Sequence, residues 1–158
     1  MFEKILVCLD GSALAKQILP YAVEEALRFE SKLILLQVVP EPVAFSPGIP
    51  GTATTPIQTD AMLDEAKKAL NESRDYLEKI AAPLRKKGLH VEAVSVLGRA
   101  GEMIVDYADN ANVNLITIAT HGRSGLGRAV FGSVADYVLR ESGLPILVIR
   151  PQESQDKD

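Results

Sequence analysis

Five short apolar segments, separated by segments with helical periodicity, constrain the fold of this sequence more than any other feature. They are residues 4–9, 32–39, 89–97, 113–119 and 145–149. Nearly continuous Val, Ile and Leu runs are typical of strands covered on both faces of a parallel sheet. The helical patterns between them fall at 13–30, 59–87, 102–110 and 133–142. This alternation predicts a doubly wound α/β fold, with right-handed crossovers that place helices on both faces of one parallel sheet.

Length and composition predict one globular domain. The 158 residues are 47% hydrophobic and 24% charged, which is ordinary for a soluble protein. We expect a single domain over residues 1–150 and a polar tail over 151–158. No apolar run reaches the roughly 18 residues that cross a bilayer, and the first strand begins too early for a signal peptide. A cytoplasmic protein that does not enter a membrane is therefore expected.

Charge and cysteine content exclude two classes of function. The formal net charge is −4, whereas general nucleic-acid binding needs a broad basic surface. The single cysteine, Cys8, lies inside an apolar run and is predicted to be a small buried residue. Two separated histidines, His90 and His121, do not complete a Cys/His metal cluster with it. An anionic ligand would have to find its positive potential locally.

Glycine and proline mark the loops. Residues 40–58 hold five prolines and two glycines, a composition that blocks both helix and strand. Because this loop follows a strand end, where ligands of α/β sheets bind, it is either a mobile flap or a passive insertion. Pro83 predicts a kink or a break near Ile80 in the helix over 59–87. Gly98 and Gly101 are expected to bracket a turn before the next helix.

The segment 113–133 combines a buried strand, a glycine-rich loop and a helix start. The loop carries Gly122, Gly125 and Gly127, and it closes on Gly132 and Ser133. Converging backbone N–H groups and the helix dipole make such an arrangement suitable for phosphate. The alternative is structural: the glycines serve turns, and Ser133 with Asp136 forms a capping box at the helix start. A Walker loop is excluded because its lysine is missing.

Charged residues near this loop have two interpretations each. Arg123 and Arg128 either pair with phosphate oxygens or are solvated surface charges. Asp10, at the end of the first strand, is either a helix N-cap or an acceptor for ribose hydroxyls or a cation. His121 is better interpreted as a loop packing residue than as an acid or base.

The spacing around this loop resembles a known signature. Ala119, two residues, Gly122, nine residues, then Gly132 and Ser133 is similar to the nucleotide-binding pattern of the universal stress protein family. That pattern is Gly, two residues, Gly, nine residues, Gly, and Ser or Thr. Residues 4–12, 120–126, 132–135 and 144–149 look like the family's opening strand and closing third. The first signature glycine is Ala119 here, which places a methyl group near the expected ribose.

The resemblance implies a strand order of 3-2-1-4-5, a dimer, and, in one branch of the family, an ATP site. By position, it implies that Gly122, Gly132, Ser133 and Val134 contact the phosphates, largely through backbone. Asp10 and Val38 would lie beside the nucleoside and Ala119 near the ribose. Two loop residues complete the predicted nucleotide site, His121 and Arg123.

These observations favour an ATP-binding regulatory protein, in which Mg²⁺ and backbone N–H groups offset the triphosphate charge. Asp10 is the candidate ligand of that metal. One alternative is a nucleotide-free interaction module of the same fold. Another is a slow ATPase or an adenylyl-transfer enzyme that uses Asp10. In the order 3-2-1-4-5, residues 145–149 form an apolar edge strand, so a two-fold dimer through this strand is expected.

Overall fold

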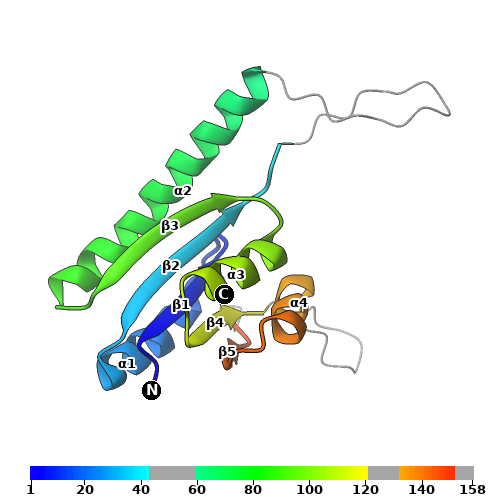
Figure 1. Cartoon of the computed structure of the whole chain (residues 1–158). Helices are drawn as coiled ribbons and strands as arrows, with labels where there is room; N and C mark the ends of the chain where they lie inside the picture. The colour runs from blue at the N-terminus through cyan, green and yellow to red at the C-terminus, as the bar shows by residue number, and fades with distance from the viewer. Residues whose placement is uncertain (43–59, 121–131, 152–158) are drawn as a thin grey trace, which may run out of the picture.

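A computed structural model shows how strands and helices alternate over residues 1–42, 60–120 and 132–151, which are the residues it describes (Figure 1). The elements are β1 Lys4–Leu9, a 3₁₀ helix η1 Ala15–Ile18, α1 Leu19–Phe29, β2 Lys32–Val39, α2 Asp60–Lys86, β3 Val91–Leu97, α3 Ala100–Asn110, β4 Leu115–Ala119, α4 Ser133–Glu141 and β5 Ile146–Ile149. The predicted loop at 40–58 and tail at 151–158 lie almost wholly outside the described residues, as does the glycine-rich loop over 121–131.

The five strands form one sheet in the order β3-β2-β1-β4-β5, and every neighbouring pair is parallel. The central strand β1 pairs on one side with β2 and on the other with β4, so that Ile5 lies opposite both Leu33 and Leu115. This confirms the doubly wound α/β fold and its 3-2-1-4-5 order. The order reverses between β1 and β4, and in such sheets the crevice beside that reversal, at the carboxyl ends of the strands, is where ligands bind.

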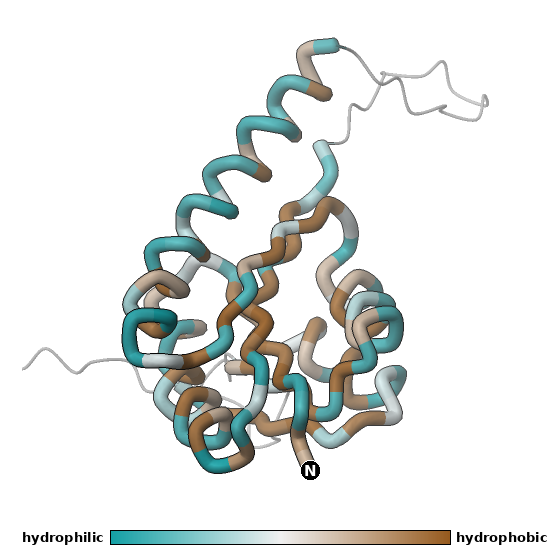
Figure 2. Tube along the Cα trace, turned by 60° about the vertical axis from the view of Figure 1, so that its left-hand side comes forward, coloured by the Kyte–Doolittle hydropathy of each residue, from teal (hydrophilic) through white to brown (hydrophobic). Residues whose placement is uncertain are grey.

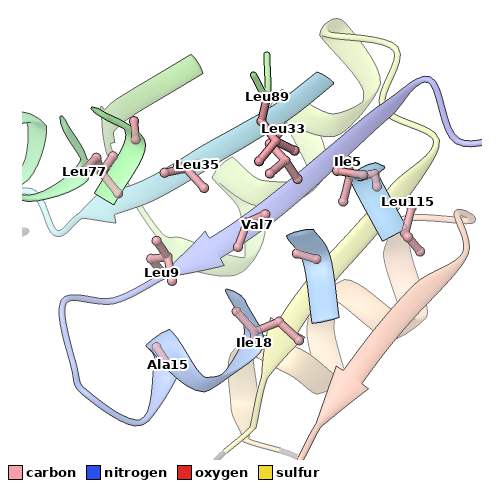
Figure 3. Close-up of a cluster of buried hydrophobic side chains, with 13 residues drawn as sticks. Ile5, Val7, Leu9, Ala15, Ile18, Leu33, Leu35, Leu77, Leu89 and Leu115 are labelled. Carbon is pink, nitrogen blue, oxygen red and sulfur yellow. The ribbon is translucent and has the colours of Figure 1, made fainter. Parts of the chain in front are cut away.

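Helices cover both faces of this sheet (Figure 2). Alternate residues of β1 point to opposite faces, as strand geometry requires. Ile5, Val7 and Leu9 pack with α1 and α2, whereas Leu6 and Cys8 pack with α3 and α4. Figure 3 shows the first of these clusters, in which Leu77 of α2 and Ile18 of η1 meet side chains of β1 and β2. The core is therefore two apolar layers separated by one sheet.

Two expectations about helices were wrong in detail. The segment expected to form one helix over 13–30 begins as the 3₁₀ helix η1 before α1. The buried residues of α1 itself are Ala22 and Ala26. The predicted break in α2 does not occur, because the helix continues past Pro83 to Lys86. The carbonyl that Pro83 leaves without a donor belongs to Lys79, which is exposed to solvent.

Gly101 does not bracket a turn, as was expected, but lies in the first turn of α3. A Cβ atom at Gly101 would lie 2.7 Å from a ring carbon of Tyr137 on α4. The glycine therefore allows the two helices to approach closely at this point.

None of the helices in the described parts of the chain combines the length and the apolar character that a membrane span requires.

Candidate functional site

A cavity of about 270 Å³ opens at the carboxyl ends of β1, β2 and β4, where the strand order reverses. Its walls come from these strand ends, from α3, and from the start of α4. Six of the predicted site residues line it: Asp10, Val38, Ala119, Gly132, Ser133 and Val134. The other three, His121, Gly122 and Arg123, lie outside the described residues. The fold thus brings together residues that are up to 124 positions apart, from Asp10 to Val134.

Asp10 occupies the turn between β1 and η1. One oxygen of its carboxylate accepts a hydrogen bond from the Ser12 N–H at 2.9 Å, and the Ser12 hydroxyl accepts one from the Ala15 N–H at 3.0 Å. Gly11, between them, has a φ of +87°, which favours glycine. The N-cap residue of η1 is Leu14, so the alternative in which Asp10 is a helix N-cap is wrong. This turn holds the Asp10 side chain at the cavity through one of its two oxygens.

The start of α4 forms the opposite wall. Gly132 is the N-cap residue, with no side-chain capping bond, and Ser133 is the first helical residue. The expected capping box is therefore wrong: the Asp136 carboxylate accepts a hydrogen bond from Arg140 at 2.6 Å. The first backbone N–H groups of a helix have no partner within it and carry partial positive charge. With the Ser133 hydroxyl uncommitted to capping, this end of the cavity offers several donors to an anion.

Ala119, which stands where the resembling signature has glycine, is the last residue of β4 and pairs with Ile149 of β5. Among the described non-glycine residues only Glu30 and Asn112 have a positive φ, so Ala119 has no conformation that requires glycine. Its methyl group is one part of the cavity wall. The substitution narrows the cavity without straining the backbone.

Thr120 is the site residue that sequence reasoning missed. It lines the cavity and is 7% exposed. Its side-chain oxygen accepts a hydrogen bond from the Gly132 N–H at 2.9 Å, and its own N–H donates to the Ile149 carbonyl at 2.9 Å. Ala100 and Ile104 of α3 also line the cavity and were not predicted. No sequence signal marks them, because a threonine after a strand and apolar residues in a helix are common.

A second hollow, of about 550 Å³, lies on the other face of the sheet and shares Asp10 and Val38 with the first. Tyr76 of α2 lines it, and the Tyr76 hydroxyl is buried without a hydrogen-bond partner among the described residues. Burial raises the pKa of Tyr76, and the nearby charge of Asp10 raises it further. Lys16 lies over the Tyr76 ring, 4.9 Å from its centre. Asp10 therefore lines two hollows, and the second of them also contains the polar side chains of Gln37, Glu72 and Ser73.

Cys8 forms part of the cavity wall, and burial raises the pKa of its thiol to about 12. The thiol keeps its proton at neutral pH, so it is a packing group and not a nucleophile. Within the described residues, no three His, Cys, Asp or Glu side chains gather into a metal site. Among the described residues that line the cavity, Asp10 carries the carboxylate. One carboxylate can serve as a single protein ligand for a cation that is held mainly by phosphate oxygens.

The thiol of Cys8 leads to a prediction for stability at high pH. Between pH 9 and 12 the unfolded chain loses this proton while the folded chain retains it, so the free energy of unfolding should fall as pH rises. The expected contribution is about 1.4 kcal/mol per pH unit in that window. Urea denaturation from pH 8.5 to 10.5 should show this slope in the wild type. Cys8→Ala should have a shallower slope, and equal slopes would contradict the assignment.

Known proteins of one family match this chain over nearly its whole length. The sequence model of the universal stress protein family matches residues 1–150. The universal stress protein YxiE of Bacillus subtilis is 31% identical over 151 residues, which are 95% of this chain and 100% of that protein.

Two solved structures share the fold. One is a universal stress protein in complex with cAMP (TM-score 0.67, 20% identity, covering 96% of this chain and 99% of that one). The other is the universal stress protein of Archaeoglobus fulgidus in complex with dAMP (TM-score 0.56, 22% identity, covering 95% and 98%).

Proposed function

Because this chain belongs to the universal stress protein family, we propose that it binds ATP with Mg²⁺ in the cavity between β1, β4 and the start of α4. The observation that carries the proposal is the meeting of an apolar cavity with a helix N-terminus at the reversal of strand order. We propose that binding makes it a nucleotide-dependent regulatory protein of the stress response. We assign this activity to one domain, residues 1–150, of a cytoplasmic protein.

The size of the cavity indicates which part of the nucleotide it can hold. About 270 Å³ is slightly below the roughly 300–1,000 Å³ of whole ligand pockets. Apolar walls from Cys8, Leu36 and Ile118 suit a base. The nucleoside therefore occupies the cavity, and the phosphates extend over the N-terminus of α4, where Ser133 and Val134 present their N–H groups. Mg²⁺ bound to the phosphates would neutralise part of their charge, with Asp10 as its protein ligand.

Two solved relatives support an adenine nucleotide, since one is a complex with cAMP and the other with dAMP. The described cavity wall contains no histidine and only Asp10 as a carboxylate, so we assign binding to it and not rapid hydrolysis. Slow ATP turnover, or adenylyl transfer through Asp10, would appear as phosphate or pyrophosphate release that Asp10→Ala abolishes.

A calorimetric titration of the purified chain with Mg-ATP, AMP and GTP tests the proposal. We expect Mg-ATP to bind about tenfold more tightly than AMP, a difference of about 1.4 kcal/mol, because more phosphate oxygens reach the start of α4. GTP should bind more weakly than ATP. Absence of heat with all three at millimolar concentration would overturn the proposal and favour the nucleotide-free interaction module.

We also propose a homodimer through β5, the apolar edge strand. The carbonyls of Pro145 and Ile149 accept hydrogen bonds from Ile116 of β4 and from Thr120, the residue after β4. Because strand residues alternate, the backbone groups of Ile146 and Val148 point toward the open edge. Such an edge pairs readily with a second strand.

A proline at this edge tests the dimer. Light scattering of the wild type should give twice the 17.1 kDa of one chain. Val148→Pro removes an edge N–H without breaking the pairing with β4, so it should give a folded monomer. Val148→Ala keeps the N–H and is the matched control, which should stay dimeric. A monomeric wild type at micromolar concentration would contradict this interface.

A further inference from the structure

Thr120 joins three elements at the edge of the cavity. Its backbone N–H donates to Ile149, which follows the pairing of β4 with β5. Its hydroxyl oxygen accepts a hydrogen bond from Gly132, the N-cap residue of α4. At 7% exposure the residue is more than nine-tenths buried, yet it is part of the cavity wall. A hydroxyl is thus held at the place where the cavity meets the helix N-terminus.

No acceptor for the proton of this hydroxyl is found among the described residues. A threonine hydroxyl has one proton to donate besides its acceptor lone pairs. The hydrogen bond from Gly132 occupies the oxygen as acceptor, and no described group is recorded as accepting a hydrogen bond from Thr120 in return. The bond from Gly132 also directs the remaining proton away from the Gly132 nitrogen. A buried donor without an acceptor is costly, and an incoming ligand oxygen would satisfy it.

We propose that Thr120 is a ligand-binding residue whose O–H donates to a phosphate oxygen of the nucleotide. The inference rests on the proposed function and assigns the donors of that same site. Phosphate is favoured over ribose because the hydroxyl lies 2.9 Å from the nitrogen of the N-cap residue, where negative charge is stabilised. Ser133 and Val134 then supply backbone N–H groups beside it.

The proposal changes the role of Gly132. The N–H of Gly132 stays inside the protein, where it orients Thr120, and is not a phosphate donor. Gly132 instead provides space, because a Cβ atom there would lie 3.6 Å from the Thr120 hydroxyl, at the edge of the ligand's place. The phosphate donors are the Thr120 hydroxyl and the N–H groups of the first helical residues.

Affinities of matched variants form the first arm of the test. Thr120→Val keeps the shape but removes the hydroxyl, and Thr120→Ser keeps the hydroxyl. Calorimetry with Mg-ATP, AMP and adenosine should show that Thr120→Val weakens both nucleotides by about 10- to 100-fold, the range of a hydrogen bond to a charged group. Adenosine, which has no phosphate, should change by less than about threefold. Thr120→Ser should stay near wild type for all three ligands.

The ratio of ATP to adenosine affinity within each variant separates the outcomes. If Thr120→Val does not fold, Thr120→Ala gives the same comparison, with the same expected fall in the ratio. A ratio equal to that of the wild type would overturn the role of Thr120. A wild type that binds none of the ligands would instead overturn the proposed function itself.

A crystal structure of the ATP complex distinguishes direct contact from an indirect effect through α4. We expect the Thr120 Oγ1 at about 2.7 Å from a phosphate oxygen, with the Gly132 nitrogen still within about 3 Å of Oγ1. A complex in which Oγ1 is more than about 3.5 Å from every ligand oxygen would make Thr120 a positioning residue of α4 only. That result would overturn the proposal even if the affinities change as expected.

Discussion

Gly132→Val is expected to abolish nucleotide binding while the fold is retained. Gly132 has a φ of −57°, which every L-residue adopts, and among the described residues the side-chain atom nearest to its Cβ position is the Thr120 hydroxyl oxygen at 3.6 Å, an ordinary contact. The backbone therefore accepts valine, but the two γ-methyl groups enter the space over Ser133 and Val134 where the phosphates would lie. We expect the dissociation constant for Mg-ATP to rise at least about 100-fold, a loss of about 2.7 kcal/mol.

The measurement pairs calorimetry with thermal unfolding. Valine is a poorer N-cap than glycine by about 1 kcal/mol, so Tm should fall by only about 2–4 °C. Gly132→Ala adds a smaller group at the same place and should weaken binding to an intermediate degree. Unchanged ATP affinity in a folded Gly132→Val protein would refute the position of the phosphates at the start of α4.

Leu77→Ala is expected to cause the largest loss of stability among substitutions in α2. Leu77 is fully buried, and it packs with Val7, Leu35 and the other side chains of the cluster in Figure 3. Replacing a fully buried leucine with alanine lowers the free energy of unfolding by about 3–4 kcal/mol. The protein loses the transfer free energy of the removed atoms and the packing contacts around the space that they leave. Urea denaturation followed by circular dichroism should show this as a lower midpoint with little change in slope.

Leu63→Ala is the matched control, since Leu63 lies on the same helix and is 46% exposed. Both variants exchange leucine for alanine in a helix, so differences in helix propensity cancel. Leu63→Ala should change the free energy of unfolding by less than about 0.5 kcal/mol. A loss below about 1 kcal/mol for Leu77→Ala would mean that α2 does not pack on the sheet as described.

Predictions that depend on neighbouring residues in the sequence were more accurate than predictions that depend on contacts between distant residues. The bounds of β1 and β2 were predicted to the residue, because each apolar run begins after a lysine and ends at a turn-forming residue, Asp10 or Pro40. The order 3-2-1-4-5 came from family resemblance and is confirmed, since apolar runs alone do not state which strands are neighbours. Capping by Ser133 and Asp10 was wrong, because several nearby polar residues fit such a role and only backbone geometry chooses among them.

The residues of the candidate site also differ in whether the sequence could reveal them. Asp10, Val38, Ala119, Gly132, Ser133 and Val134 were placed at one site by their motif, and they do line one cavity. Their binding of nucleotide stays a prediction, as do the roles of His121, Gly122 and Arg123. Thr120 escaped notice because its importance lies in one hydrogen bond to a residue 12 positions away. No periodicity or composition records such a contact.

The sequence by itself determined the class of fold, because short runs of Val, Ile and Leu that alternate with amphipathic helical segments are typical of strands covered on both faces by helices. Tertiary structure alone decided which hydroxyl meets which N–H, and therefore which donors remain for a ligand. The reason is physical: burial depends on the kind of side chain and is encoded locally. A hydrogen bond at 2.9 Å depends on the relative placement of β4 and α4, which the packing of the whole chain sets.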